Sequence, residues 1–172
     1  FSVCADGKGF GKGNTYPSLD GHQMSDALLW LGQDQAVKAN WDYVKSFQKP
    51  DGLLPIAILP GSRKVFETPV EPNGGFYKHW APGNPLRGLA APTYVQNADV
   101  IFRRTQDLAW LRAQLPSVNL AGGQLESLAT KQGRVGGAGY YIERPPRIEF
   151  DGVTQGHAFD AFQRLSALNR RA

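Results

Sequence analysis

Two acidic residues in the last quarter of the chain are the first candidates for chemistry. Glu149 and Asp151 stand two positions apart in IEFDGVTQGHAFDAF, residues 148 to 162, before a stretch of helical periodicity. If the backbone is extended there, both carboxyls point to one side and can face one cavity. Two close carboxylates raise the pKa of one, which keeps a general acid protonated near neutral pH. Alternatively, Asp151 caps an Asp-Gly turn, and Glu149 pairs with Arg147 or is solvated.

A second group of polar residues precedes an apolar helical pattern near the start of the chain. Asp20, His22 and Gln23 lie together in GNTYPSLDGHQMSDALLWLG. Hydrogen-bonding side chains at one helix start suit a polyhydroxylated ligand. The alternative is that Asp20 only caps the helix and His22 is a surface residue.

Aromatic residues gather between glycines and prolines in GGFYKHWAPGNP, residues 74 to 85. Exposed aromatic rings on a constrained loop are costly unless they stack on something, and the C–H faces of sugar rings offer such a surface. Trp80 is the candidate for this contact. The alternative is that the loop folds its own aromatic rings inward.

Several other site classes find no support in the sequence. The three histidines, His22, His79 and His157, lack the short spacing of metal ligands, so no metal site is expected. The glycine-rich GKGFGKG, residues 7 to 13, lacks the P-loop pattern, and no G-x-S-x-G elbow occurs. The lone Cys4 excludes an internal disulfide framework. We therefore expect no cofactor.

The composition is that of one globular domain spanning residues 1 to 172. The chain is 41% hydrophobic, which suffices for a sizeable core. The net charge is +4, but basic residues come singly or in pairs, which disfavours a nucleic-acid partner. No apolar run approaches the ~18 residues of a membrane span, so no membrane partner is expected. The chain lacks an initial methionine and a signal pattern, so it is either processed or a piece of something longer.

Helical periodicity predicts an αα-hairpin in the first third of the chain. Asp20 is the expected N-cap of a helix that ends at Gly32, and a second helix begins after Asp34 and ends at KPDG, residues 49 to 52. Apolar residues spaced three and four apart predict that the first helix is amphipathic, namely Met24, Ala27, Leu28 and Leu31. Trp41 and Trp110 lie on helical faces and are expected in the core.

The hairpin pattern repeats with a shift of 73 positions. DALLWLGQDQAV, residues 26 to 37, aligns with DVIFRRTQDLAW, residues 99 to 110. The second helix of this later hairpin is expected to restart or kink at Pro116. A third unit begins with a helix over residues 154 to 168, capped by Thr154. The slot three residues before a repeated aspartate holds Gln23 (before Asp26), Gln96 (before Asp99) and His157 (before Asp160).

Repeated hairpins indicate an array, because one hairpin cannot bury its apolar face alone. The connections over residues 49 to 92 and 130 to 153 are long. Loops of such length in a helical domain are usually functional.

These segments resemble the six-hairpin (α/α) toroid glycosidase clan, which includes glucoamylase-like, α-rhamnosidase-like and maltose-phosphorylase-like enzymes. The resemblance rests on DALLWLGQDQAVKANWDYVKSFQKPDGLLP, residues 26 to 55, which is similar to the clan's helix, Gly, helix, Q-x-x-DG-x-x-P unit. FRRTQDLAWLRAQLPSVNLAGGQLESL, residues 102 to 128, is similar to another of its hairpins. The motifs are typical of the clan and do not single out one substrate family.

The resemblance implies a glycoside hydrolase portion with an all-α fold of about two and a half hairpins. In the clan the general acid lies just before an inner helix, which corresponds here to Asp151 or, as its neighbour or substitute, Glu149. The predicted sugar-binding residues are Asp20, His22, Gln23, Trp80, Gln96 and His157. The clan's second carboxylate comes from a late hairpin, which a chain ending at Ala172 lacks. Further chain segments or subunits are therefore expected to complete the barrel, and without them this chain is expected to be inactive.

Two other functions stay open at this point. The first is a sugar phosphorylase on the same scaffold, in which phosphate replaces the base and one protein acid suffices. The second is a non-catalytic helical repeat that binds carbohydrate or protein, in which the polar residues at helix starts are caps.

Overall fold

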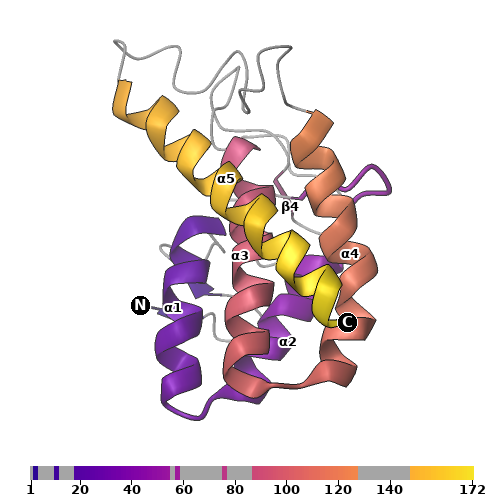
Figure 1. Ribbon diagram of the computed structural model, residues 1–172. Helices are drawn as coiled ribbons and strands as arrows, with labels where there is room; N and C mark the ends of the chain where they lie inside the picture. Colours follow the sequence, from indigo (N-terminus) through magenta and orange to yellow (C-terminus); the bar gives the residue numbers. More distant parts are fainter. Residues whose placement is uncertain are drawn as a thin grey trace.

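The protein is built from α-helices, as the sequence predicts (Figure 1). The computed structural model describes residues 2–3, 10–11, 18–54, 57–58, 75–76, 87–127 and 148–172, with side chains at 24–54, 90–127 and 155–172. Its helices are α1 (Ser18–Trp30), α2 (Asp34–Lys45), α3 (Arg87–Thr105), α4 (Leu108–Ser127) and α5 (Ile148–Arg171). Four two-residue strands form two antiparallel pairs, which are β1 (Ser2–Val3) with β2 (Phe10–Gly11) and β3 (Ala57–Ile58) with β4 (Gly75–Phe76).

The helices form two hairpins, α1–α2 and α3–α4, followed by α5. The turns of both hairpins lie at the same end of the molecule, the lower end in Figure 1. Consequently α1 and α3 run toward that end, and α2 and α4 run away from it. Helix α5 lies across the bundle and runs toward the same end as α3 (Figure 1). The predicted succession of two hairpins and one further helix is confirmed for the described residues.

Each hairpin turn contains a residue in the left-handed region of backbone space. Gly32 ends α1 with φ +71°, where its N–H donates to the carbonyl of Leu29 and the N–H of Gln33 donates to that of Leu28. This pair of bonds is a Schellman motif, in which glycine is favoured because it has no Cβ. The equivalent turn after α3 uses Gln106, with φ +53° and a single bond from its N–H to the carbonyl of Phe102.

Asp107 is the N-cap of α4, whereas its repeat equivalent, Asp34, is the first residue of α2. Its Oδ1 accepts a hydrogen bond from the N–H of Trp110 at 2.9 Å. Its Oδ2 accepts one from Nζ of Lys38 on α2 at 2.7 Å, and this bond lowers the pKa of the Asp107 carboxyl. In the first hairpin Gln33 is the N-cap residue and makes no side-chain cap bond.

Several predicted helix boundaries are wrong, including those of α2, which begins at Asp34 itself and ends at Lys45, before residues 49 to 52. Asp20 lies inside α1, which begins at Ser18, so it is not the N-cap. Thr154 lies inside α5, which begins six residues earlier than predicted, at Ile148. Helix α4 does not restart at Pro116 but continues as one helix to Ser127. The connections between the hairpins are accordingly shorter than the sequence suggested.

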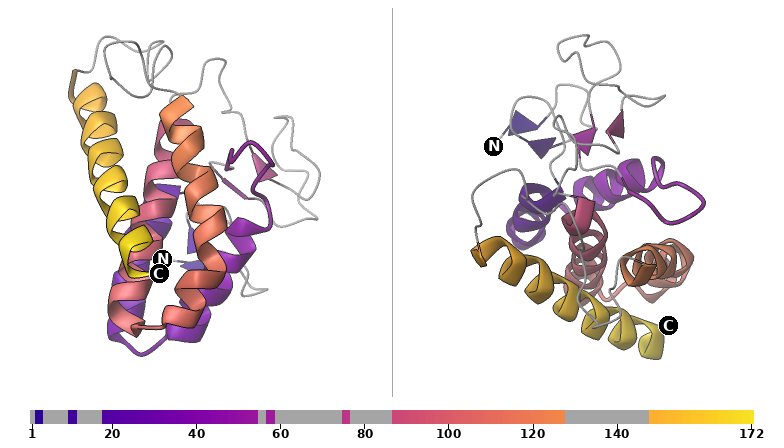
Figure 2. Two further views of the ribbon diagram at one scale, coloured as in Figure 1. Left: turned by 45° about the vertical axis from the view of Figure 1, so that its right-hand side comes forward. Right: turned by 90° about the horizontal axis from the view of Figure 1, so that it is seen from above.

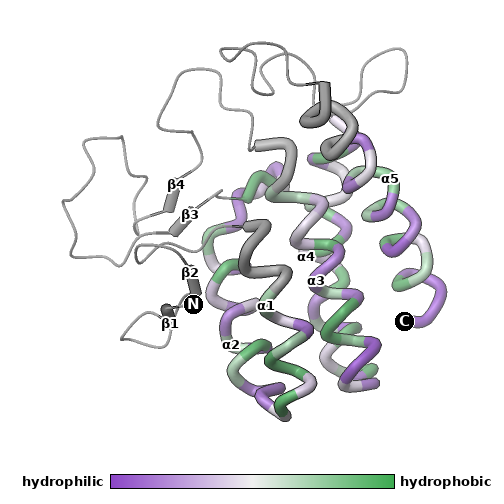
Figure 3. Tube along the Cα trace, turned by 90° about the vertical axis from the view of Figure 1, so that its left-hand side faces the viewer, coloured by the Kyte–Doolittle hydropathy of each residue, from purple (hydrophilic) through white to green (hydrophobic). Residues whose placement is uncertain are grey.

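Helix α3 lies at the centre of the bundle, between the other four helices (Figure 2). Every residue from 90 to 99 is buried. Its apolar residues pack against stripes of the neighbouring helices, whose described parts alternate between hydrophobic and hydrophilic residues (Figure 3). Because α3 is covered all round over residues 90 to 99, the polar side chains of this part must find partners inside the protein.

Trp41 anchors the contact between α2 and α3, as predicted for a core residue. It is 1% exposed, and its ring stacks on that of Tyr94 with centroids 3.7 Å apart. Trp110 packs against the edge of this pair, with its centroid 5.8 Å from that of Trp41, and is only partly buried.

Helices α2 and α4 lie side by side and run in the same direction. Two hydrogen bonds join Lys45 Nζ to Gln114 Oε1 at 2.6 Å and Gln48 Nε2 to the carbonyl of Ser117 at 3.1 Å. Together with the Lys38–Asp107 bond, all three join residues 69 positions apart. A constant separation at successive turns is possible only for parallel helices in register.

The glycine pair in α4 gives a test of how closely α4 and α5 pack. A Cβ at Gly122 would overlap the side chain of Leu165 on α5, whereas a Cβ at Gly123 would meet open space. We expect Gly123→Ala to stabilise the protein by about 0.5–1 kcal/mol, because alanine favours a helix over glycine. Gly122→Ala loses this gain to overpacking and should destabilise by about 1 kcal/mol. Urea unfolding of both variants measures the difference, and equal values would contradict the close α4–α5 contact.

Candidate functional site

Five of the predicted site residues lie in the first two turns of α1 and α5. Asp20, His22 and Gln23 belong to the start of α1, and Glu149 and Asp151 to the start of α5. Because the two helices run in the same direction, both starts lie away from the hairpin turns (Figure 1). The side chains of all five lie outside the described part of the structure.

The backbone around Glu149 and Asp151 is helical, not extended as the sequence argument assumed. Successive residues of an α-helix are rotated by about 100° around its axis, so positions two apart project about 200° from each other. The geometric reason for expecting both carboxyls on one side is therefore wrong. Either residue alone remains a candidate acid at the start of α5.

The remaining predicted site residues are Trp80, Gln96 and His157. Trp80 lies outside the described residues. Gln96 and His157 are described, and they contact each other across the interface between α3 and α5. Gln96 is 4% exposed, and its Oε1 lies 2.9 Å from Nδ1 of His157.

Gln96 also contacts the next turn of α5. Its Nε2 donates a hydrogen bond to Oδ2 of Asp160 at 2.7 Å. The amide of Gln96 is thus held on both sides, by His157 through its oxygen and by Asp160 through its nitrogen. This arrangement orients neighbouring side chains, whereas the sequence argument expected Gln96 to contact a sugar directly.

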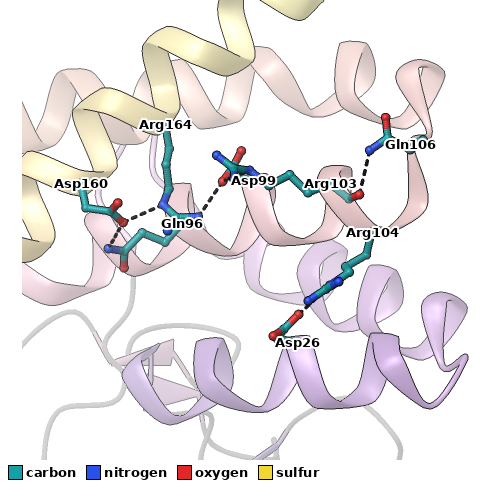
Figure 4. Close-up of polar contacts among 8 residues, drawn as sticks. All are labelled: Asp26, Gln96, Asp99, Arg103, Arg104, Gln106, Asp160 and Arg164. Carbon is teal, nitrogen blue, oxygen red and sulfur yellow. Dashed lines mark hydrogen bonds and ion pairs between the residues drawn. The ribbon is translucent and has the colours of Figure 1, made fainter.

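Arg164 connects this group to the most deeply buried carboxylate of the interface (Figure 4). Its Nε donates to Oδ2 of Asp160 at 2.6 Å, and its Nη1 donates to Oδ2 of Asp99 at 2.6 Å. The Asp99 side chain is 2% exposed and also pairs with Nε of Arg103 at 2.8 Å. The buried Asp99 carboxylate is therefore balanced by two guanidinium groups, which is the condition for keeping its charge buried. We call Gln96, His157, Asp160, Arg164, Asp99 and Arg103 the α3–α5 network.

The α3–α5 network shifts the pKa values of its members in directions that follow from their contacts. Burial lowers the pKa of His157, and the nearby Asp160 carboxylate opposes this only in part. Burial raises the pKa of Asp160, but the hydrogen bonds from Arg164 and Gln96 outweigh it, so the pKa lies below its usual value. Burial lowers the pKa of Arg164. Its bonds to Asp160 and Asp99 raise the pKa by more, so it lies above its usual value. At neutral pH the network thus holds a neutral imidazole beside an ionised carboxylate.

Four members of the network were not recognised as partners from the sequence. Both Asp99–Arg103 and Asp160–Arg164 are four residues apart, the spacing at which an acid and a base meet on a helix. That spacing was a readable signal for the ion pairs within each helix. The bond from Arg164 to Asp99 had no local signal, because it depends on how α3 and α5 pack.

The motif that carries much of the family resemblance has a structural role here. In QKPDG, residues 48 to 52, the Oδ1 of Asp51 accepts a bond from the N–H of Leu53 at 3.0 Å. Gly52 has φ +86° and packs against the backbone of Leu120 on α4. Gln48 bonds to Ser117 on α4. These residues fasten the end of the first hairpin to α4.

Among the residues with described positions, no cluster of three or more histidine, cysteine or acidic side chains could hold a metal ion. Within the same ranges, no helix has the length and apolarity to cross a bilayer. Comparison of the chain with protein-family models, with curated proteins and with solved structures returned no match.

Proposed function

We propose that the chain is part of a glycoside hydrolase with an (α/α) hairpin toroid, in which α1, α3 and α5 are inner helices. The observation that supports this best is the common direction of these three helices (Figure 1). It directs the starts of α1 and α5, where predicted sugar-binding and acid residues lie in the sequence, away from the hairpin turns (Figure 1). We infer that polar groups from helices far apart in sequence gather on that side, as a site for a polyhydroxylated ligand requires.

In the proposed mechanism Asp151 donates a proton to the glycosidic oxygen as the sugar leaves, and Glu149 is the substitute if Asp151 does not. Asp20, His22, Gln23 and Trp80 bind the sugar, and the α3–α5 network orients His157 toward it. Hydrolysis also needs a carboxylate that activates water or attacks the sugar. We propose that this group comes from further chain segments or subunits that complete the barrel.

A sugar phosphorylase on the same scaffold is the second candidate. It uses one protein acid together with phosphate, and the helical backbone leaves Asp151 or Glu149 as that single acid. The hydrolase takes its second carboxylate from elsewhere, so dependence on phosphate distinguishes the two functions.

The proposal predicts that Asp151→Asn abolishes turnover without changing helix content. We would assay the polypeptide as it occurs naturally on a panel of chromogenic aryl glycosides and on maltose, with and without inorganic phosphate. Circular dichroism would monitor the helices. Asp42→Asn is the matched control, because Asp42 is an exposed aspartate of α2, and this variant should keep full activity.

The outcomes separate the three functions. Release of free sugar that Asp151→Asn or Glu149→Gln abolishes supports the hydrolase and identifies its acid. Sugar phosphate that forms only with phosphate supports the phosphorylase. Binding without any product in the intact polypeptide would overturn catalysis and favour a binding module. Full activity in both acid variants would exclude this pair from the chemistry.

A further inference from the structure

The hydrogen-bond chain Asp160–Gln96–His157 determines which nitrogen of His157 carries a proton. A glutamine amide can usually be turned to suit its neighbours, and a neutral imidazole can carry its proton on either nitrogen. Here Asp160, at one end of this series of hydrogen bonds, determines both the orientation of the Gln96 amide and the tautomer of His157.

The series of hydrogen bonds begins at the Asp160 carboxylate, which can only accept a hydrogen bond. Asp160 is ionised at neutral pH, because Arg164 and Gln96 lower its pKa, and an ionised carboxylate has no hydrogen to donate. The Gln96 atom 2.7 Å from it must therefore be the amide nitrogen. The two bonds from Arg164, to Asp160 and to Asp99, hold this carboxylate in place.

The orientation of the Gln96 amide in turn determines the tautomer of the His157 imidazole. With its nitrogen directed at Asp160, Gln96 presents its oxygen to Nδ1 of His157 at 2.9 Å. An amide oxygen only accepts, so Nδ1 must donate and must carry the hydrogen. In a neutral imidazole the proton on Nδ1 leaves Nε2 with a free lone pair.

We propose that Asp160 and Gln96 are positioning residues that hold His157 as the Nδ1–H tautomer, so that its Nε2 is a preset hydrogen-bond acceptor. The chemical group that fits Nε2 is a donor such as a sugar hydroxyl. The assignment of a sugar hydroxyl as this donor rests on the proposed function, whereas the tautomer of His157 does not. Among the described residues, Asp160 is the charged group that acts on the His157 imidazole, and Asp160 is itself paired with Arg164, which also pairs with Asp99.

The test is two-bond ¹H–¹⁵N NMR of histidine-labelled protein near neutral pH, with His157 assigned by its loss in His157→Asn. We expect a protonated Nδ1 and an unprotonated Nε2, and a titration midpoint below 6.5, the usual value. In Gln96→Leu the acceptor is gone, and His157 should shift toward the Nε2–H form that free imidazole side chains favour. In Asp160→Asn the new amide can also donate, so Gln96 can turn and the Nδ1–H fraction should fall.

Gln114→Leu is the matched control, because Gln114 is another buried glutamine, on α4, that contacts Lys45. It should leave the His157 signals unchanged. A His157 that is protonated on Nε2 or doubly protonated near neutral pH in the unaltered protein would overturn the proposal. So would an unchanged tautomer in Gln96→Leu with retained circular dichroism. None of these readouts needs a substrate, so failure of the hydrolase proposal would be seen separately, in the turnover assay.

Discussion

Trp41→Ala should lower the free energy of unfolding by about 4 kcal/mol, the range for removing a buried tryptophan from a core. The side chain is 1% exposed, stacks on Tyr94 and meets the edge of Trp110. Alanine would leave a cavity at the junction of α2, α3 and α4 that these rings cannot fill. The Nε1 of Trp41 has no hydrogen-bond partner within the described structure, so the loss arises from packing alone. Urea unfolding measures it.

Trp30→Ala is the matched control for this substitution. Trp30 is 69% exposed at the end of α1, where the Arg104 guanidinium lies 4.0 Å from its ring centroid. Removing this ring should cost at most about 1 kcal/mol, the scale of an exposed cation–π contact. Equal losses in the two variants would show that the described core does not depend on Trp41.

Asp99→Asn should destabilise the protein by about 3 kcal/mol. Its carboxylate is 2% exposed and balances both Arg103 and Arg164. Removing one partner of a buried pair costs about 3–5 kcal/mol, because the other charge stays uncompensated. The lower end applies, since Arg103 reaches solvent and Arg164 keeps Asp160. Thermal and urea unfolding give the loss, and a double-mutant cycle with Arg164→Met isolates the coupling.

The repeat supplies the control at the equivalent position. Asp26 aligns with Asp99, and its Oδ1 accepts a bond from Nε of Arg104 at 2.9 Å. Both side chains of this pair are more than a third exposed, so solvent screens the charges. Asp26→Asn should change stability by less than about 1 kcal/mol. A comparable loss in the two variants would contradict the argument that burial makes Asp99 critical.

The helix boundary that matters most for the site shows where sequence reasoning reached its limit. Gly152 and Val153 have low helix propensity, so the pattern placed the start of α5 at Thr154. In the structure the helix continues back through them to Ile148. Once a well-packed helix has formed, each further residue adds a bond without a new nucleation cost, and a weak segment can follow. Pro116 is an exposed residue within α4, and the helix continues through it because Gln114, Ser117 and Val118 on the opposite face are buried.

The sequence by itself determined the two hairpins, their turns and the burial of Trp41, because helical periodicity and turn residues are local properties. It also identified Gln96 and His157 as related positions of a repeat. Only the tertiary structure decided that they meet each other and Asp160, since those contacts join residues 61 and 64 positions apart. Such pairings depend on the register between α3 and α5, which is set by packing along the whole interface and is written in no single segment of the chain.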